Sequence, residues 1–178
     1  MHPNLRRRFD EHVQAVLEER ARLLARSIAS EPQRSKIWEL LTFRLGQERY
    51  AVETRFVQKV FRPTEISPVP RTAGFLKGVT NLRGEVLAGM DLSSFLGRAG
   101  NGNQAEWVLV FGDDRPEFGL LAETIEEVIQ RKDEELFPVR NGPMHASTDL
   151  IRGVTADALF VLDGEKLLND PRLMIDEL

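Results

Sequence analysis

The sequence predicts a mainly β protein with some α-helix, built as two related small β-barrel subdomains that follow an N-terminal amphipathic helix. Residues 4–29 carry apolar side chains at intervals of three and four, as one face of a helix requires. From Ile37 the chain changes to short β-branched or aromatic runs, and several motifs occur twice in one order. Many short strands favour barrels, because closure removes exposed strand edges.

The N-terminal segment, residues 1–34, is expected to be a helical extension. Its apolar stripe consists of Leu5, Phe9, Val13, Val16, Leu17, Leu24 and Ile28. Pro3 suits the first helical turn, and Ser30-Glu31-Pro32 ends the helix. The stripe must be covered either by the rest of the chain or by a partner helix.

Residues 35–178 are expected to form the β domain, with a loop between its two halves at 98–104. Strand-like runs occupy Leu41–Leu45, Tyr50–Val52, Val57–Phe61, Ile66–Val69, Trp107–Phe111, Phe118–Ala122, Ile125–Ile129 and Ala158–Leu162. A hairpin within residues 75–90 turns at Asn81–Glu85, because Gly84 can adopt a positive φ. Asp91 and Asp163 precede short helical segments that they can cap, and Pro171 suits the start of another helix.

Three pairs of landmarks indicate that the β domain is a duplicated unit. Leu76–Thr80 matches Ile151–Thr155 at an offset of 75 positions, and Met90–Leu96 matches Leu162–Leu168 at 72. Upstream, Tyr50-Ala-Val matches Phe118-Gly-Leu at 68. Short loop insertions account for the drift, so we expect two related halves with a pseudo-twofold relation. Chance similarity of short apolar motifs is the alternative.

Composition argues against an enzyme and against a metal or cofactor site. Cysteine is absent, and the three histidines, His2, His12 and His145, lack ligand spacing. No phosphate-binding or dinucleotide-binding glycine motif occurs. Glu123, Glu126 and Glu127 alternate with apolar residues, which is typical of a solvated strand face. We expect no catalysis and no cofactor, and a hydrolase that uses the acidic strand is the enzyme alternative.

The sequence also limits the location and the partners. No apolar run approaches the roughly twenty residues of a membrane span. Arg6–Arg8 is followed by Phe9-Asp10-Glu11 instead of the apolar core of a signal peptide, so we expect a cytoplasmic protein. Basic residues are scattered without interleaved aromatics, which argues against nucleic-acid binding.

Charge is distributed unevenly along the chain. The net charge is −4, with +4 in residues 35–104 and −10 in residues 105–178. This split favours head-to-tail contact with a similarly polarised partner, because complementary fields steer association. The alternative is that the basic and the acidic surfaces are simply solvated and take no part in partner contact.

The string Gly78-Val-Thr-Asn-Leu-Arg-Gly84, followed by Met90-Asp91-Leu92, resembles the bacterial chemotaxis coupling protein family, CheW. The likeness extends from about Leu41 to Leu168. It implies two intertwined five-stranded β-barrel subdomains around a shared apolar core. It also implies a non-enzymatic scaffold that joins methyl-accepting receptor tips to the regulatory domain of the chemotaxis histidine kinase. A CheW-like adaptor of a non-chemotaxis two-component or surface-motility pathway is the alternative.

The resemblance also assigns site residues. The receptor-groove candidates are Val57, Val79, Leu82, Arg83 and Leu87, and the kinase-contact candidates are Phe75, Gly78 and Asn81. The alternative for the apolar receptor-groove candidates is that they are ordinary barrel core. The alternative for Arg83 is that it is an exposed turn residue without a binding role. Self-association through the N-terminal helix is a further expected interaction.

Three positions depart from the family pattern. Lys59 stands where an acidic residue usually follows Val-Gln, so an ion pair with Arg83 is lost there. Ala88-Gly89-Met90 replaces the usual proline and β-branched residue, and Ala122-Glu123 replaces a Val-Asp pair. These departures predict a divergent coupling protein with altered partner choice.

Overall fold

The computed structural model describes residues 17–22, 35–98, 105–139 and 148–173. The chain divides into two units, Met1–Ser35 and Lys36–Leu178, and each is described by itself. In the first unit residues 17–22 are helical, as the apolar periodicity predicts for this stretch. The remainder of the predicted helix over 4–29 lies outside the described residues.

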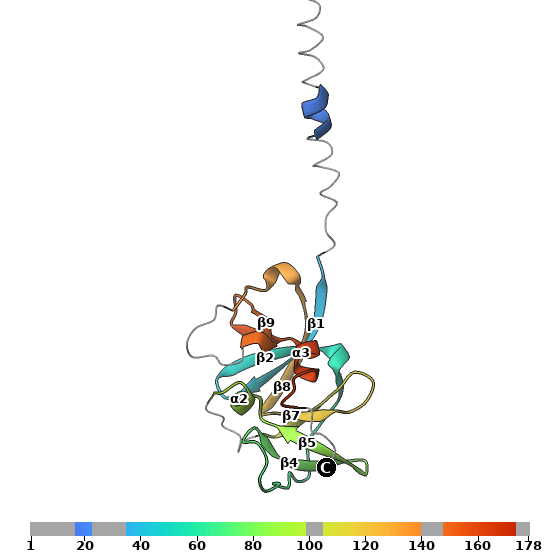
Figure 1. Ribbon diagram of the computed structural model, residues 1–178, viewed down its shortest axis with the longest axis vertical. Helices are drawn as coiled ribbons and strands as arrows, with labels where there is room; N and C mark the ends of the chain where they lie inside the picture. The colour runs from blue at the N-terminus through green and yellow to red at the C-terminus, as the bar shows by residue number, and fades with distance from the viewer. Residues whose placement is uncertain (1–16, 23–34, 99–104, 140–147, 174–178) are drawn as a thin grey trace, which may run out of the picture. The chain divides into compact units, whose positions relative to one another are not determined.

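The second unit contains two five-stranded sheets (Figure 1). Sheet A has the order β8 (Thr124–Lys132), β1 (Ile37–Leu45), β2 (Glu48–Glu53), β10 (Leu159–Leu162), β9 (Ile151–Val154). Sheet B has the order β3 (Val57–Phe61), β6 (Trp107–Phe111), β7 (Phe118–Ala122), β5 (Glu85–Met90), β4 (Leu76–Leu82). The short helices are α2 (Leu92–Phe95) and α3 (Gly164–Leu168), with 3₁₀ turns at Thr54–Phe56, Asp133–Glu135 and Thr148–Leu150. The predicted mainly β architecture is confirmed.

Sheet B repeats sheet A strand for strand. Strands β1 to β5 correspond to β6 to β10, and this exchange converts the order of one sheet into that of the other. The strand pairings agree as well. The pair β2–β10 is parallel, and so is its counterpart β7–β5. The pair β1–β8 has a bulge at the same place as its counterpart β6–β3. This topology supports the predicted duplication. The two halves do not fold separately, however, because each sheet takes strands from both.

The caps of the two short helices are confirmed. The Asp91 side chain accepts a hydrogen bond from the Ser93 backbone N–H at 3.0 Å and another from the Ser94 hydroxyl at 2.7 Å. In the second half, Asp163 accepts from the Lys166 backbone N–H at 3.2 Å. Each carboxylate therefore satisfies a donor that the helix start leaves open, which explains both aspartates without catalysis.

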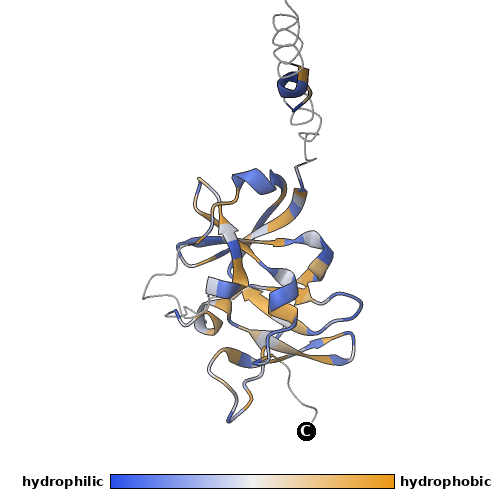
Figure 2. Cartoon of the chain, turned by 45° about the horizontal axis from the view of Figure 1, so that its top comes forward, coloured by the Kyte–Doolittle hydropathy of each residue, from blue (hydrophilic) through white to orange (hydrophobic). Residues whose placement is uncertain are grey.

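Apolar side chains gather between and inside the sheets. Figure 2 shows that hydrophobic residues, in orange, lie mainly on the strands and hydrophilic ones, in blue, mainly on the connecting loops. A shared core joins the two sheets and includes Phe43, Tyr50, Phe111 and Phe118. A smaller cluster lies within each sheet, around Trp38, Leu40, Ala51, Leu159 and Val161 in sheet A, and around Leu87, Val108, Val110 and Leu121 in sheet B. The fold therefore has one central core and two outer ones.

Two predicted elements are wrong. The run Ile66–Val69 is not a strand: only Ser67 pairs there, with Val79 of β4. Pro68 and Pro70 lack the N–H that a longer ladder needs. Pro171–Leu173 forms turns and not a helix.

The pairing at Ser67 has a counterpart at Phe137, which pairs with Val154 of β9. Within the described ranges, single bridges of this kind, and no ladders, link the chain after β3 to β4 and the chain after β8 to β9.

Candidate functional site

The β4–β5 hairpin holds the most distinctive sequence motif at the edge of sheet B. Leu82 pairs with Glu85, so Arg83 and Gly84 form a two-residue turn with φ of 53° and 93°. Positive φ at both positions matches the twist of a hairpin, and the Asn81 side chain accepts a hydrogen bond from Gly84 N–H at 2.9 Å. Such a φ is uncommon for a residue with a Cβ. The result is an exposed arginine on a rigid turn.

One side of this hairpin borders a shallow hollow of about 320 Å³, named here the sheet B depression. Its lining comes from the hairpin and from strands of both halves: Gln58, Lys59, Leu82, Arg83, Glu85, Val110 and Pro116. It combines apolar side chains with two cations, Lys59 and Arg83, and one carboxylate, Glu85. Both cations are exposed, and among the described residues neither forms an ion pair with a carboxylate.

A second hollow of about 450 Å³ borders the hairpin at other residues. Its lining is Thr64, Glu65, Ser67, Val79, Thr80, Asn81 and Val86. Val86 is 75% exposed, an unusual state for a large apolar side chain on a strand. The structure therefore divides the predicted site residues: Leu82 and Arg83 line the sheet B depression, while Val79 and Asn81 line this one.

The other two receptor-groove candidates line neither hollow. Leu87 is 4% exposed and belongs to the outer core of sheet B, against which Leu82 packs. Val57 is partly buried against the shared core. Leu87 therefore supports the hairpin from inside the sheet and has little surface to offer a partner.

Phe75 and Gly78, two of the kinase-contact candidates, have clear packing roles. The Phe75 ring meets Phe95 edge-to-face at 4.9 Å, and its carbonyl accepts from Asp91 N–H at 2.8 Å. A Cβ on Gly78 would lie 2.3 Å from the carbonyl oxygen of Ser67, at a φ of 155°. Glycine is thus required for the close approach of Ser67 to β4.

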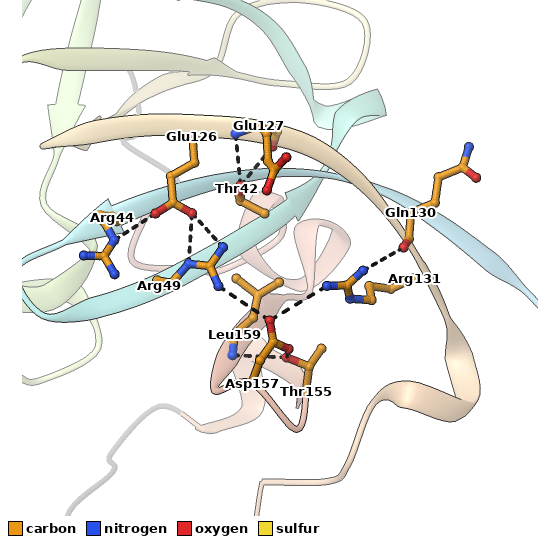
Figure 3. Close-up of polar contacts among 10 residues, drawn as sticks. All are labelled: Thr42, Arg44, Arg49, Glu126, Glu127, Gln130, Arg131, Thr155, Asp157 and Leu159. Carbon is orange, nitrogen blue, oxygen red and sulfur yellow. Dashed lines mark hydrogen bonds and ion pairs between the residues drawn. The ribbon is translucent and has the colours of Figure 1, made fainter.

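Sheet A carries a chain of ion pairs on its outer surface, shown in Figure 3 and named here the sheet A ladder. Glu126 accepts hydrogen bonds from Arg44 at 2.8 Å and from Arg49 at 2.9 Å. Asp157 lies 3.5 Å from Arg49 and 3.8 Å from Arg131. The ladder crosses β8, β1 and β2 and reaches the β9–β10 turn, so it ties strands of both halves together.

The two ladder carboxylates are held in the charged form. Burial raises the pKa of Glu126, but the hydrogen bonds and charges of Arg49 and Arg44 outweigh it and lower that pKa below its ordinary value. The hydrogen bond from the Thr155 hydroxyl, at 2.6 Å, lowers the pKa of Asp157, with the charges of Arg131 and Arg49 assisting against partial burial. Both acidic groups are therefore fully engaged within the chain.

Neither a group of metal ligands nor a membrane-spanning helix occurs among the described residues. They contain no group of three His, Asp or Glu side chains that could hold a metal ion. They also contain no helix long and apolar enough to cross a membrane. His2, His12 and His145 all lie outside the described residues.

Comparison with known protein families decides the relationship. The model of the CheW-like domain matches residues 39–172, most of the chain. The chain belongs to the CheW-like domain family. The fold agrees, since the crystal structure of the scaffolding protein TtCheW from Thermoanaerobacter tengcongensis superposes with a TM-score of 0.61 at 20% identity. That likeness covers 72% of this chain and 90% of the other.

Individual CheW-like relatives are distant in sequence. The chemotaxis protein CheW of Klebsiella aerogenes is 28% identical over 143 residues, which cover 77% of this chain and 85% of that protein. The protein FrzA of Myxococcus xanthus is 43% identical, but over only 60 residues, or 34% of this chain and 38% of FrzA. The overall fold is therefore shared at a level of identity that leaves room for different partner contacts.

Sequence reasoning missed several residues of the sheet B depression. Gln58, Glu85, Val110 and Pro116 line it, yet they come from β3, β5, β6 and the segment before β7. Lys59 did give a signal, because its charge departs from the family pattern. The other residues carry no local signal, since strands of both halves bring them together.

Proposed function

We propose that this CheW-like chain is a non-enzymatic adaptor that couples methyl-accepting chemoreceptors to a chemotaxis histidine kinase. Its family membership supports this role, as do relatives named chemotaxis protein CheW and a fold shared with a scaffolding protein. The two hollows that border the β4–β5 hairpin, together with the exposed cations Lys59 and Arg83, suit contact with other proteins.

The observation that carries the proposal is the β4–β5 turn. It holds Arg83 exposed at a positive φ, with Leu82 beside it in the lining of the sheet B depression. A helical receptor tip can place an apolar side chain against Leu82 and bond to the guanidinium, whose fixed donors give direction. We assign receptor contact to Leu82 and Arg83, with Val57 and Leu87 as support beneath.

The second hollow suits the other partner. Asn81 and the exposed Val86 lie in it, and Val79 lines it from β4. We assign the kinase contact to this side of the hairpin, with Gly78 and Phe75 holding its shape. One hairpin would then touch both partners, which is what an adaptor between them requires.

Replacing Arg83 by alanine tests the receptor assignment. The side chain is exposed and without an ion pair among the described residues, so Arg83→Ala should keep the fold and lose receptor binding in pulldown and calorimetry. Arg71→Ala is a matched control, because Arg71 is also an exposed arginine at a positive φ, 67°. Unchanged receptor binding by Arg83→Ala would contradict the assignment.

Further parts of the proposal are structural. We infer that each five-stranded sheet closes into a barrel, supported by the single bridges at Ser67 and Phe137. We also propose that residues 1–34 form a separate helical extension that mediates self-association, and that residues 35–178 form the CheW-like domain. We also propose a cytoplasmic location, which the coupling of receptors to a kinase would require.

An adaptor of a non-chemotaxis two-component or surface-motility pathway remains the alternative. The two functions differ in one measurable respect, since the alternative binds a kinase without any methyl-accepting receptor. Pulldown with both fragments separates them.

A further inference from the structure

Five charged side chains beside α3 form a chain of contacts, named here the α3 cluster: Glu53, Arg55, Arg152, Asp163 and Glu165. Arg55 lies between Glu53 and Glu165, with nitrogen-to-oxygen distances of 2.8 and 2.9 Å. Arg152 of β9 lies between Asp163 and Glu53, and its Nη2 is 3.3 Å from an oxygen of the first and 3.9 Å from an oxygen of the second. Three carboxylates therefore share two cations, and Arg152 is the one with unequal partners.

Two buried atoms of this cluster have no hydrogen-bond partner among the described residues. They are Glu53 Oε1, an acceptor, and Arg152 Nε, a donor, and they belong to the more widely separated of the two Arg152 pairs. Glu53 is only 9% exposed, so solvent does not replace the missing bonds. The observed arrangement thus pairs Arg152 with Asp163 and leaves a donor and an acceptor of the Arg152–Glu53 pair unused.

A second arrangement of Arg152 would exchange one deficit for another. If the guanidinium turns toward Glu53, both unused atoms gain a partner, while Asp163 loses its cation and keeps its hydrogen bond from the Lys166 N–H at 3.2 Å. The guanidinium carbon lies 4.2 Å from the centre of the Trp38 ring, a fixed surface against which the head group can turn. Each arrangement leaves one largely buried carboxylate poorly paired, which is the condition for two states of similar free energy.

Sheet B has the same site with one carboxylate fewer. According to the strand pairings, Lys77 and Asp91, 3.7 Å apart, stand where sheet A has Arg152 and its α3 carboxylate. The counterpart of Glu53 is Leu121, a buried residue of the outer core. Among the described residues Lys77 therefore has one carboxylate to bind, and the fold itself does not require a competition for this cation.

We propose that Arg152 is a two-position latch, which holds Asp163 at the start of α3 in one position and Glu53 at the end of β2 in the other. The first position ties β9 to α3, and the second ties β9 to β2. Arg55 sets the balance, because it is the other cation available to Glu53. Since Arg55 is exposed, a change at the surface of the Thr54–Phe56 turn reaches α3 through Glu53 and Arg152. The latch is a property of the free chain and does not depend on any partner.

The competing interpretation is a fixed cluster, in which Arg152 always binds Asp163 and Glu53 belongs to Arg55 alone. In a fixed cluster, removing Glu53 leaves the strength of the Arg152–Asp163 pair unchanged. In a latch, the same removal strengthens that pair, because Arg152 is no longer divided between two carboxylates. A double-mutant cycle measures the strength of the pair and separates the two interpretations.

The cycle combines Arg152→Met, which keeps an apolar stem beside Trp38, with Asp163→Asn, which keeps a residue that caps helices well. Urea denaturation of the full chain gives the unfolding equilibrium constants, and the cycle is repeated in Glu53→Leu, which carries the residue type of sheet B. We expect the coupling between Arg152 and Asp163 to rise by about threefold or more in that background. If Glu53→Leu does not fold, Glu53→Gln removes the charge at nearly the same shape and replaces it.

The same cycle in Arg55→Ala tests how the latch is set. Glu53 then has no other cation in the cluster, so Arg152 should move to it and the coupling should fall by about threefold. Glu165→Gln is the matched control, because it removes a carboxylate that is paired with Arg55 and not with Arg152. The coupling in that background should stay within about twofold of its value in the unmodified chain.

The Arg152 Nε–H signal in the NMR spectrum gives a second measurement, since this donor gains an acceptor only in the second position. Its proton should shift downfield and exchange more slowly with solvent in Asp163→Asn and in Arg55→Ala. Equal coupling in the unmodified chain and in Glu53→Leu would overturn the latch. A rise in Glu165→Gln as large as in Glu53→Leu would also overturn it, because the cause would then be the general loss of negative charge. An Nε–H signal that Asp163→Asn leaves unchanged would show that Arg152 has no second position.

Discussion

Sheets A and B share one topology and one register but differ in what fills their outer cores. The interior of sheet A contains Trp38 with Ala51 and Val161. At the equivalent places sheet B has the exposed Glu106 and two glycines, Gly119 and Gly89. The two sheets therefore keep the same topology although different side chains fill their outer cores.

The shared core has diverged much less than the outer cores. Phe43 stacks on Tyr50 with ring centres 5.9 Å apart, and their counterparts Phe111 and Phe118 stack at 5.1 Å. Both pairs lie where strands of the two halves meet. The contact between the sheets is therefore the part that both halves must keep, and each outer core serves only its own sheet.

Among the variants that test this difference, Trp38→Ala has the largest expected effect on stability. The side chain is 3% exposed, and its indole N–H donates to Asp133 at 3.0 Å. Trp38→Ala should lower the free energy of unfolding by about 3–5 kcal/mol, because it leaves a large cavity in an outer core that no neighbour can fill. Urea denaturation followed by circular dichroism measures the change.

Trp107→Ala is the matched control for Trp38. Trp107 is only partly buried, with the Arg62 guanidinium 4.6 Å from its ring centre. We expect a clearly smaller loss, since part of the ring already contacts solvent. Equal losses in both variants would mean that the outer core of sheet A is not specially dependent on its tryptophan.

The second test places an alanine in sheet B at Gly119, the position equivalent to Ala51 of sheet A. A Cβ on Gly119 would lie 2.6 Å from Val108 Cγ1 and 3.1 Å from Leu87 Cδ2. Gly119→Ala should therefore cost about 1–3 kcal/mol of unfolding free energy through overpacking, although Ala51 is tolerated at the equivalent place. Thermal unfolding of the variant measures the loss.

The control for overpacking is Gly74→Ala, where no atom lies within 4 Å of the new Cβ. This variant should unfold at nearly the same temperature as the unmodified chain. Adding Val108→Ala to Gly119→Ala should cost less than the two single losses combined, because it removes the clashing methyl group. Simple additivity would show that the two positions do not compete for space.

Local signals in the sequence identify the elements of this fold but not their assembly. The capping aspartates, the Asn81–Glu85 turn and the strand Val57–Phe61 could be predicted, because each depends on neighbouring residues. The intertwining could not be derived from these patterns, since Tyr50 pairs with Phe160, about 110 positions away. It was implied only by the family resemblance.

The candidate site follows the same division. The sequence motif identified Leu82 and Arg83, which the structure brings together in the sheet B depression. It could not separate them from Val79, because alternation along β4 sets which face a residue takes but not which hollow lies there. Nor could it show that Leu87 is buried, since that depends on contacts from β6 and β7.

The smallest effect concerns the sheet A ladder and its dependence on pH. The pKa of Glu126 is lower in the folded chain than in the unfolded one, so its contribution to stability is present above the unfolded pKa. That contribution is lost as the pH falls through the folded pKa. Glu126→Gln should therefore cost about 1 kcal/mol or less near pH 7 and a smaller amount near pH 3.

Urea denaturation of the unmodified chain and of Glu126→Gln at both pH values measures this difference. Glu127→Gln is the neighbouring control, because the Glu127 side chain has no ion pair or hydrogen bond among the described residues. It should lose less stability at neutral pH and show less dependence on pH. If Glu126→Gln keeps the same deficit at pH 3 as at pH 7, the ladder stabilises sheet A by packing of its side chains and not by charge.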